Sequence, residues 1–192
     1  MTQLRIVCLA VVGLAGFACA GAPEKPPQPT GPPMHACELI LLPEADPDGL
    51  DGLMPAKTEV DQSVGDEFAK CVYATPDLPP HLVSLEVRRF VNEKRAGGAQ
   101  RTAVDYLPSL AAEPLVAIAG LGDEAVWAGG KLGQLHVRDG RQRLIVTVET
   151  GDPVARRARA EAIAGRALER LHAPPPGATR PVQGVPAPPG SR

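Results

Sequence analysis

The segment Gly120-Leu-Gly122-Asp-Glu-Ala125 has the residue types and spacing of a dinucleotide-binding turn, and it follows the apolar run 115–119. In such a turn the glycines open a helix whose N-terminus receives a pyrophosphate group. Further glycines at 129–133 would interrupt that helix, and the two acidic residues of the motif would repel phosphate. We therefore interpret the segment as a glycine turn between two strands, and we expect no cofactor.

Three aspartates, Asp46, Asp48 and Asp51, could offer oxygen ligands to calcium. An EF-hand loop needs acidic residues at its first, third and fifth positions and a bidentate glutamate at its twelfth. In this chain Leu50 stands at the fifth position and Lys57 at the twelfth. The sequence therefore favours a solvated turn here, and we expect no metal ligand.

Hydrolytic chemistry would need a nucleophile with a neighbouring base. Ser63, Ser84 and Ser109 lack a G-x-S-x-G or S-x-x-K context. Asp123 and Glu124 could act as an acid–base pair, but adjacent residues of a strand point to opposite faces. The sequence therefore assigns no catalytic residue. We expect a protein that is not an enzyme, and an extracytoplasmic hydrolase is the alternative.

Two further features could bind a ligand or a surface. Trp127 could stack on a ligand, although a lone tryptophan is more typical of a core. The segment 154–171 reads as a helix with five arginines, a composition that suits anionic lipid. Its other face is largely alanine, which suits packing on a sheet better than insertion among acyl chains. We therefore interpret the arginine side as a solvated surface.

Residues 1–20 have the pattern of an export signal, with Arg5 followed by an uncharged run from 6 to 20. That run is shorter than the ~20 apolar residues that a membrane-spanning helix needs. Two maturations are open: cleavage before Gly21, or lipidation of Cys19 as in bacterial lipoproteins. Gly16 and Phe17 depart from the residues expected before a lipidated cysteine. We expect an exported protein that is either anchored by lipid or released into the periplasm or the medium.

Cys37 and Cys71 are the two cysteines that follow the signal. In an oxidising compartment two cysteines form one disulfide, and closing a loop of about 35 residues stabilises a fold by about 4 kcal/mol. A redox pair or metal site is the alternative, but the chain has no C-x-x-C motif and its histidines are scattered along it. These histidines are His35, His81, His136 and His172.

Prolines divide the chain of 192 residues into segments. Residues 21–36 and 173–192 are rich in proline and are expected to be a disordered tether and a disordered tail. Between them, residues 37–172 are long enough for one domain with a single core. With a formal charge of −2, the chain has no excess of basic residues that would indicate binding to nucleic acid or to a membrane surface. Contact with a membrane is therefore expected only through a lipid anchor.

Apolar patterns inside the domain predict strands at 38–42, 68–74, 82–91, 124–128, 132–138 and 141–149, with a loop at 43–56. The strand at 82–91 alternates clearly, with Val83, Leu85 and Val87 on one face and Ser84, Glu86 and Arg88 on the other. Asp139-Gly140 predicts a two-residue hairpin turn that pairs Leu135 with Leu144. The expected fold class is α+β, with an antiparallel sheet of hairpins packed with two helices, the longer one C-terminal, and one disulfide.

The two helices are expected at 99–107 and 153–171. Gly97-Gly98 is expected to end the preceding strand, and Asp152 with Pro153 is a favourable start for the second helix. The face of the first helix is predicted to hold Ala99, Ala103, Tyr106, Leu107 and Leu110. The second is predicted to bury Ala160, Ile163, Ala164, Ala167 and Leu171 and to expose Arg156, Arg157, Arg159, Glu161, Arg166 and Arg170.

Part of the chain resembles a class of small exported bacterial lipoproteins that carry a domain of unknown function. The resemblance covers roughly residues 68–171 and lies mainly in three segments. Before these segments, the family and this chain share a cysteine that shortly precedes an aromatic residue, here in Cys71-Val-Tyr73. These segments are Gly120-Leu-Gly122-Asp-Glu-Ala-Val-Trp127, Gly133-Gln-Leu-His-Val-Arg-Asp-Gly140 and Leu144-Ile-Val-Thr-Val148. The resemblance implies an extracytoplasmic, non-catalytic domain, and it offers no catalytic residues to transfer. We expect such a domain to bind a small ligand, an envelope component or a protein partner, with a purely structural module as another alternative.

Overall fold

Seven antiparallel strands form one sheet in the order β1-β2-β3-β7-β6-β5-β4. A computed structural model describes residues 34–47, 49, 51–61, 66–111, 113–131 and 133–173. The strands are β1 (Met54–Asp61), β2 (Asp66–Ala74), β3 (Leu82–Phe90), β4 (Val116–Ala117), β5 (Glu124–Ala128), β6 (Gln134–Asp139) and β7 (Gln142–Val148). The signal segment 1–20 with Cys19, most of the expected tether and residues 174–192 lie outside the described residues.

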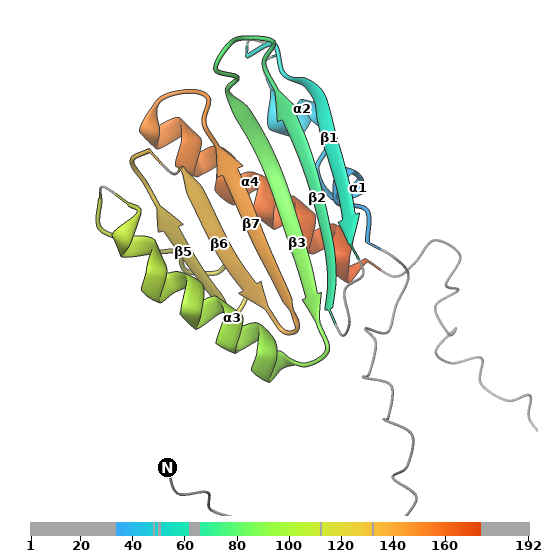
Figure 1. Cartoon of the computed structure of the whole chain (residues 1–192), viewed down its shortest axis with the longest axis vertical. Coiled ribbons are helices and arrows are strands. Elements are labelled where there is room, and N and C mark those ends of the chain that lie inside the picture. Colours follow the sequence, from blue (N-terminus) through green and yellow to red (C-terminus); the bar gives the residue numbers. More distant parts are fainter. Residues whose placement is uncertain are drawn as a thin grey trace, which may run out of the picture.

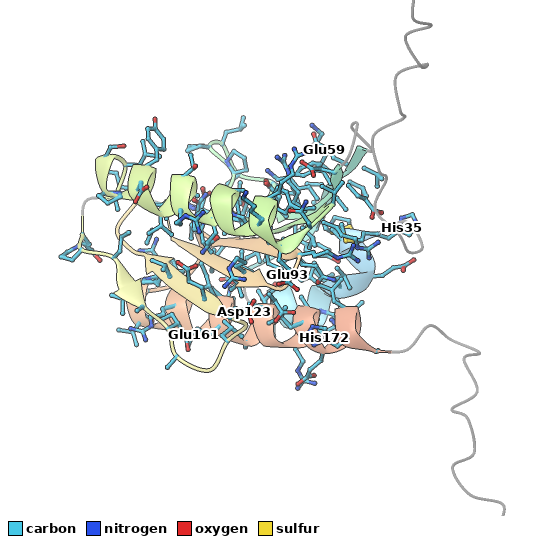
Figure 2. All side chains as sticks on the ribbon, turned by 90° about the horizontal axis from the view of Figure 1, so that it is seen from below. His35, Glu59, Glu93, Asp123, Glu161 and His172 are labelled. Carbon is cyan, nitrogen blue, oxygen red and sulfur yellow. A yellow bond between two sulfur atoms is a disulfide. The ribbon has the colours of Figure 1, made fainter. Side chains whose placement is uncertain are left out.

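Helices cover both faces of the sheet. The helices α1 (Ala36–Leu39), α2 (Leu42–Ala45) and α4 (Pro153–His172) share one face, and α3 (Glu93–Tyr106) lies on the other (Figure 1). Figure 2 shows α3 and α4 as separate layers with the sheet between them. The α+β class, the antiparallel sheet and the long C-terminal helix are therefore confirmed. Within the described residues, no helix has the length and apolar character needed to cross a membrane.

The main core lies between the sheet and α4. Val83, Leu85 and Val87 of β3 are fully buried, as their alternation predicts. They belong to the same core cluster as Ile163 and Ala164 of α4. Alanines on the buried side of α4 let the helix lie close to the sheet, because they carry no long side chain. The core therefore rests on aliphatic residues from strands and on small residues from the helix.

The start of α4 follows the local sequence signal. The carboxylate of Asp152 accepts hydrogen bonds from the backbone N–H groups of Val154 and Ala155, at 2.9 and 3.1 Å. These amides have no partner within the helix, so the side chain satisfies them. The helix extends to His172, and Leu168 is buried more fully than Leu171. The predicted helix and most of its buried face are therefore confirmed.

The arginines of α4 were predicted to be solvated, and for three of them this is wrong. Arg170 donates to the carbonyl oxygen of Leu39 at 2.7 Å and to both carboxylate oxygens of Glu44. These hydrogen bonds hold the pKa of Glu44 below its usual value. Arg159 donates to Asp51 at 2.5 Å and to Thr150 at 2.6 Å. Arginines of α4 therefore fix the helix to the N-terminal segment.

Arg156 is the third of these arginines. Its Nη1 donates to the carbonyl oxygen of Gly130 at 3.3 Å, and its side chain is half-buried. Arg166, in contrast, is exposed as predicted. The partners of Arg156, Arg159 and Arg170 lie far away in the sequence, so a helical pattern alone could not reveal them.

Cys37 and Cys71 form the predicted disulfide, which joins α1 to β2 across a sequence separation of 34. The Cα atoms of the two cysteines are 5.0 Å apart. Cys71 is buried in the core, and Cys37 packs against its edge. The disulfide therefore attaches the N-terminal helices directly to the sheet.

The predicted strand at 38–42 is wrong, because this segment contributes to the two short helices α1 and α2. A short apolar run fits a buried strand and a buried helix equally well. Glu44 selects the helix start of α2, since its carboxylate accepts from the backbone N–H of Leu41 at 3.0 Å. Met34 and Ala36 are buried, so packing begins before Cys37, inside the expected tether.

The predicted loop at 43–56 is also too long, because β1 begins at Met54. This edge strand shows little apolar alternation, and its Met54 and Val60 are exposed. An edge strand is held mainly by backbone pairing with its neighbour, here β2, so its side chains carry only a weak signal. The sequence therefore gave no clear indication of β1.

The helix predicted at 99–107 begins earlier, at Glu93, and includes the Gly97-Gly98 pair. Asn92 caps it by accepting a hydrogen bond from the backbone N–H of Arg95 at 2.9 Å. Ala96 and Gln100 of α3 are buried, as is Leu107 directly after it, whereas Tyr106 and Leu110 are 62% and 49% exposed. The predicted buried face of this helix is therefore wrong, because the prediction left out its first two turns.

Replacing Gly98 by alanine is expected to raise the free energy of unfolding by about 0.5–1 kcal/mol, because alanine restricts the unfolded chain and favours the helix. A Cβ atom at this position meets no other atom within 4 Å. Urea-induced unfolding of both proteins measures the difference. A loss of stability in Gly98→Ala would contradict the helical assignment of this glycine pair.

The hairpin between β6 and β7 forms, but its register is shifted by two residues. Gly140 and Arg141 make the turn, so Val137 pairs with Leu144 and Leu135 pairs with Val146. Gly140 has φ +54, and no described residue other than glycine has a positive φ. Glycine at the first central position suits a type II′ turn, whereas a turn at Asp139-Gly140 would need a positive φ at the aspartate. A shift of two keeps every side chain on its predicted face.

Candidate functional site

The glycine segment at 120–125 is a turn between β4 and β5, as predicted. Gly120 and Gly122 have φ values of +77 and +63. Asp123 accepts hydrogen bonds from Arg138 at 2.7 Å and from the backbone N–H of Gly140 at 2.9 Å. The motif therefore ties the β4–β5 turn to the β6–β7 turn, and its residues open no helix.

Asp123 and Glu124 do not point to opposite faces, because Asp123 belongs to the turn and only Glu124 belongs to β5. Both carboxylates face Arg138, at 2.7 and 3.7 Å. The arginine offsets one of the two negative charges and connects both carboxylates to β6. This arrangement stabilises the turn and leaves neither carboxylate next to a candidate nucleophile.

The acidic loop near residue 50 also uses its carboxylates internally. Asp46 accepts from the backbone N–H groups of Asp51 and Leu53 at 3.3 and 3.4 Å. Asp51 pairs with Arg159 of α4. Asp48 lies outside the described residues. Within the described part of the chain, no group of three or more histidines, cysteines and acidic residues is placed to hold a metal ion.

The candidate serines are dispersed. Ser84 was predicted to face outward, but it is buried because α3 covers this face of the sheet. The hydroxyl of Ser109 donates to the carbonyl oxygen of Tyr106 at 2.7 Å. Ser63 lies outside the described residues. The structure therefore brings neither described serine to a histidine or a carboxylate.

A chain of polar side chains lies on the α3 face of the sheet, and sequence reasoning missed it. Arg143 donates from Nε to Gln100 at 3.2 Å, and its Nη2 lies 3.1 Å from His136 Nδ1. His136 Nε2 lies 3.2 Å from the Gln134 Oε1 atom, and Gln134 donates to Thr147 at 3.3 Å. We call these five residues the α3 polar layer. Its members come from α3, β6 and β7.

The donor directions in the α3 polar layer follow from Arg143, which can only donate hydrogen bonds. His136 Nδ1 must therefore accept, and a neutral ring then carries its proton on Nε2 and donates it to Gln134. Burial, and secondly the charge of Arg143, lowers the pKa of His136 from 6.5 to about 4. The layer thus holds a neutral histidine in one tautomer, which is a structural role.

The neutral His136 predicts a loss of stability in acid. Its pKa is depressed in the folded protein, so the unfolded protein binds a proton first as the pH falls below 6.5. The stabilisation is complete above pH 6.5, is lost as the pH falls towards 4, and amounts to about 3 kcal/mol. Urea unfolding of the wild type and of His136→Gln at several pH values between 7.5 and 4.5 isolates the contribution of this histidine. Equal pH dependence in the two proteins would contradict the assignment.

An open cleft of about 450 Å³ lies where β4, the end of β5 and the first turns of α4 meet. Its lining residues come from the segments 113–116, 127–130 and 153–161. Glu161 projects from α4, in the layer opposite α3 (Figure 2). This volume falls within the range of small-molecule sites. We call it the Trp127 cleft, because Trp127 is the one aromatic residue in its lining.

Charged groups of both signs line the Trp127 cleft. Arg157 pairs with Glu161 at 2.7 Å. Arg156 Nη1 binds the Gly130 carbonyl oxygen, but its Nε is buried and has no hydrogen-bond partner. Because Nε has almost no accessible surface, a ligand in the cleft would meet Arg156 through other atoms of its side chain.

Gly129 allows close approach at the floor of the cleft. A Cβ atom there would lie 2.5 Å from Glu113 Oε2 and 3.3 Å from Trp127 Nε1. The glycine therefore lets the Glu113 carboxylate and the indole N–H share one small region. The sequence suggested Trp127 as a ligand contact and Arg156 as part of a solvated helix face, but it did not connect either residue with Glu113.

No protein-family model matches this sequence, and no curated protein sequence matches it as a relative. The resemblance to exported lipoproteins therefore stays a hypothesis. The Trp127 cleft must be interpreted from its own geometry and charge.

Proposed function

We propose that this chain is an exported, non-catalytic bacterial envelope protein whose domain binds a small ligand in the Trp127 cleft. The observation that carries the proposal is an open cleft of ligand size whose lining combines Trp127 with charged side chains of both signs. Val154 at the rim is 80% exposed, which adds apolar surface for a ligand to cover. A ligand that fills the cleft would pair with these charges and remove apolar atoms from water.

The composition of the cleft favours binding over hydrolysis. Its lining contains no serine, threonine, cysteine or histidine, so none of the usual nucleophiles stands beside its two glutamates. The extracytoplasmic hydrolase is the second candidate, and it would need a water molecule activated by Glu113 or Glu161. Reproducible turnover in a broad hydrolase screen, abolished by Glu113→Gln, would establish this alternative.

Export and anchoring belong to the same proposal. The signal pattern of residues 1–20 and the Cys37–Cys71 disulfide both suit an oxidising compartment outside the cytoplasm. Lipidation of Cys19 would hold the domain at a membrane, whereas cleavage before Gly21 would release it. Mass spectrometry of the mature N-terminus distinguishes a lipid-modified cysteine from an unmodified glycine.

Native mass spectrometry of the full chain purified from a bacterial envelope tests the binding function. We expect a bound small molecule in the wild type and its loss in Gly129→Val, because the added side chain occupies the cleft floor and displaces Glu113. Gly98→Val is the matched control, since a Cβ atom there meets nothing within 4 Å and lies on α3. Absence of any ligand in the wild type, or equal occupancy in Gly129→Val, would contradict the proposal.

A further inference from the structure

We infer that the ligand of the Trp127 cleft is a small zwitterion, with an ammonium group bound by Glu113, a carboxylate bound by Arg156 and an apolar body packed against Val116 and Val154 beside Trp127. An apolar dipeptide has this chemistry. The inference rests on the proposed binding function and specifies the class of ligand. It is carried by the charges that remain unpaired inside the cleft.

Four charged side chains line the cleft, and two of them neutralise each other. Arg157 and Glu161 form an ion pair at 2.7 Å, one helical turn apart on α4. Glu113 and Arg156 form no ion pair among the described residues. The cleft therefore presents one free negative group and one free positive group. A ligand with a single charge would leave one of them without a partner.

The two free charges lie beside the same short turn. The Glu113 carboxylate approaches the Cα of Gly129, and the Arg156 guanidinium binds the carbonyl oxygen of Gly130. Both groups are therefore placed at adjacent residues of one cleft. A small molecule that carries both an ammonium and a carboxylate, such as a short peptide, would engage both.

The protein donors and acceptors match the two ends of such a ligand. Arg156 lines the cleft without a carboxylate partner among the described residues, and a carboxylate is the acceptor that a guanidinium binds best. Glu113 is exposed and accepts only, so it suits an ammonium group. Val116 and Val154 are 38% and 80% exposed in the same cleft and would cover an aliphatic side chain, whereas Trp127 beside them is 6% exposed and belongs to the core.

Trp127 is the only tryptophan of the chain, so its fluorescence reports occupancy of the cleft directly. The probes are leucyl-leucine, its N-acetyl derivative without the ammonium group, and its amide without the carboxylate. Titration of the full chain, followed by Trp127 fluorescence and calorimetry, should show saturable binding of leucyl-leucine. Each derivative should bind at least about ten-fold more weakly, since one charge-assisted hydrogen bond is lost.

Two variants assign each charge to its end of the ligand. In Glu113→Gln the dipeptide should bind no more tightly than the N-acetyl derivative but still more tightly than the amide. In Arg156→Gln it should bind no more tightly than the amide but still more tightly than the N-acetyl derivative. Circular dichroism and thermal unfolding establish that each variant is folded, and Gly98→Val serves as the control remote from the cleft.

Equal binding of the dipeptide and both derivatives would overturn the zwitterion while leaving the cleft as a binding site. Binding of none of the three would also overturn it, and native mass spectrometry would then show separately whether the cleft carries a ligand of another class. An empty wild-type cleft in that second experiment would refute the proposed function itself.

Discussion

Replacing both Cys37 and Cys71 by alanine is expected to lower the free energy of unfolding by about 4 kcal/mol. The disulfide closes a loop across a sequence separation of 34, and opening it increases the entropy of the unfolded chain. It also joins α1 to β2, so its loss releases the N-terminal helices from the sheet. Guanidinium-induced unfolding of the variant and the wild type measures the effect.

Reduced wild type is the matched control for this experiment, because it lacks the bond but keeps both sulfur atoms. It separates the constraint on the unfolded chain from the packing of Cys71, whose side chain is buried. A thiol-reactive label added to denatured, unreduced protein should leave both cysteines unmodified. Labelling of both, or equal stability of the oxidised and reduced proteins, would refute the disulfide as a stabilising element.

The second large effect is expected for Gly122→Ala, which should destabilise the domain by about 2–5 kcal/mol. Gly122 has φ +63, a conformation that costs an alanine about 1–2 kcal/mol. Its Cβ atom would also lie 2.6 Å from the carbonyl oxygen of Arg138 and 2.9 Å from Val137 Cγ1. Relieving this contact needs a backbone shift, which adds about 1–3 kcal/mol.

Gly120→Ala separates the two causes. Gly120 has a similar φ of +77, but a Cβ atom there meets nothing within 4 Å. This variant should therefore lose only the conformational contribution of about 1–2 kcal/mol. Thermal or urea unfolding of both variants gives the comparison. Equal losses would show that the approach of Gly122 to β6 is unimportant, and the role assigned to the motif would be wrong.

The position of α4 links stability to the proposed binding function. Its first turns form one wall of the Trp127 cleft, whereas Arg159 and Arg170 bind Asp51 and Glu44 near the other end of the chain. The N-terminal segment is in turn held by the disulfide. The cleft is therefore built on a helix that is fixed to the sheet by packing and to the N-terminal segment by ion pairs.

Local signals in the sequence determined several parts of this protein. The alternation of Val83, Leu85 and Val87 predicted β3 and its buried face, because side-chain direction in a strand depends only on position along it. Asp152 and Pro153 predicted the start of α4, because a cap acts on amides two or three residues away. The glycines at 120 and 122 predicted a turn, and the cysteines predicted their pairing.

The tertiary structure alone decided which surfaces meet. Ser84 and His136 are buried because α3 covers the second face of the sheet, and nothing within either strand specifies that cover. Arg159 and Arg170 find their acidic partners 108 and 126 residues away, so their helical pattern could only suggest exposure to water. The Trp127 cleft has the same origin. It joins Glu113, Trp127 and Arg156 from three separate segments, and only the packing of α4 on β6 and β7 brings its first turns beside the end of β5.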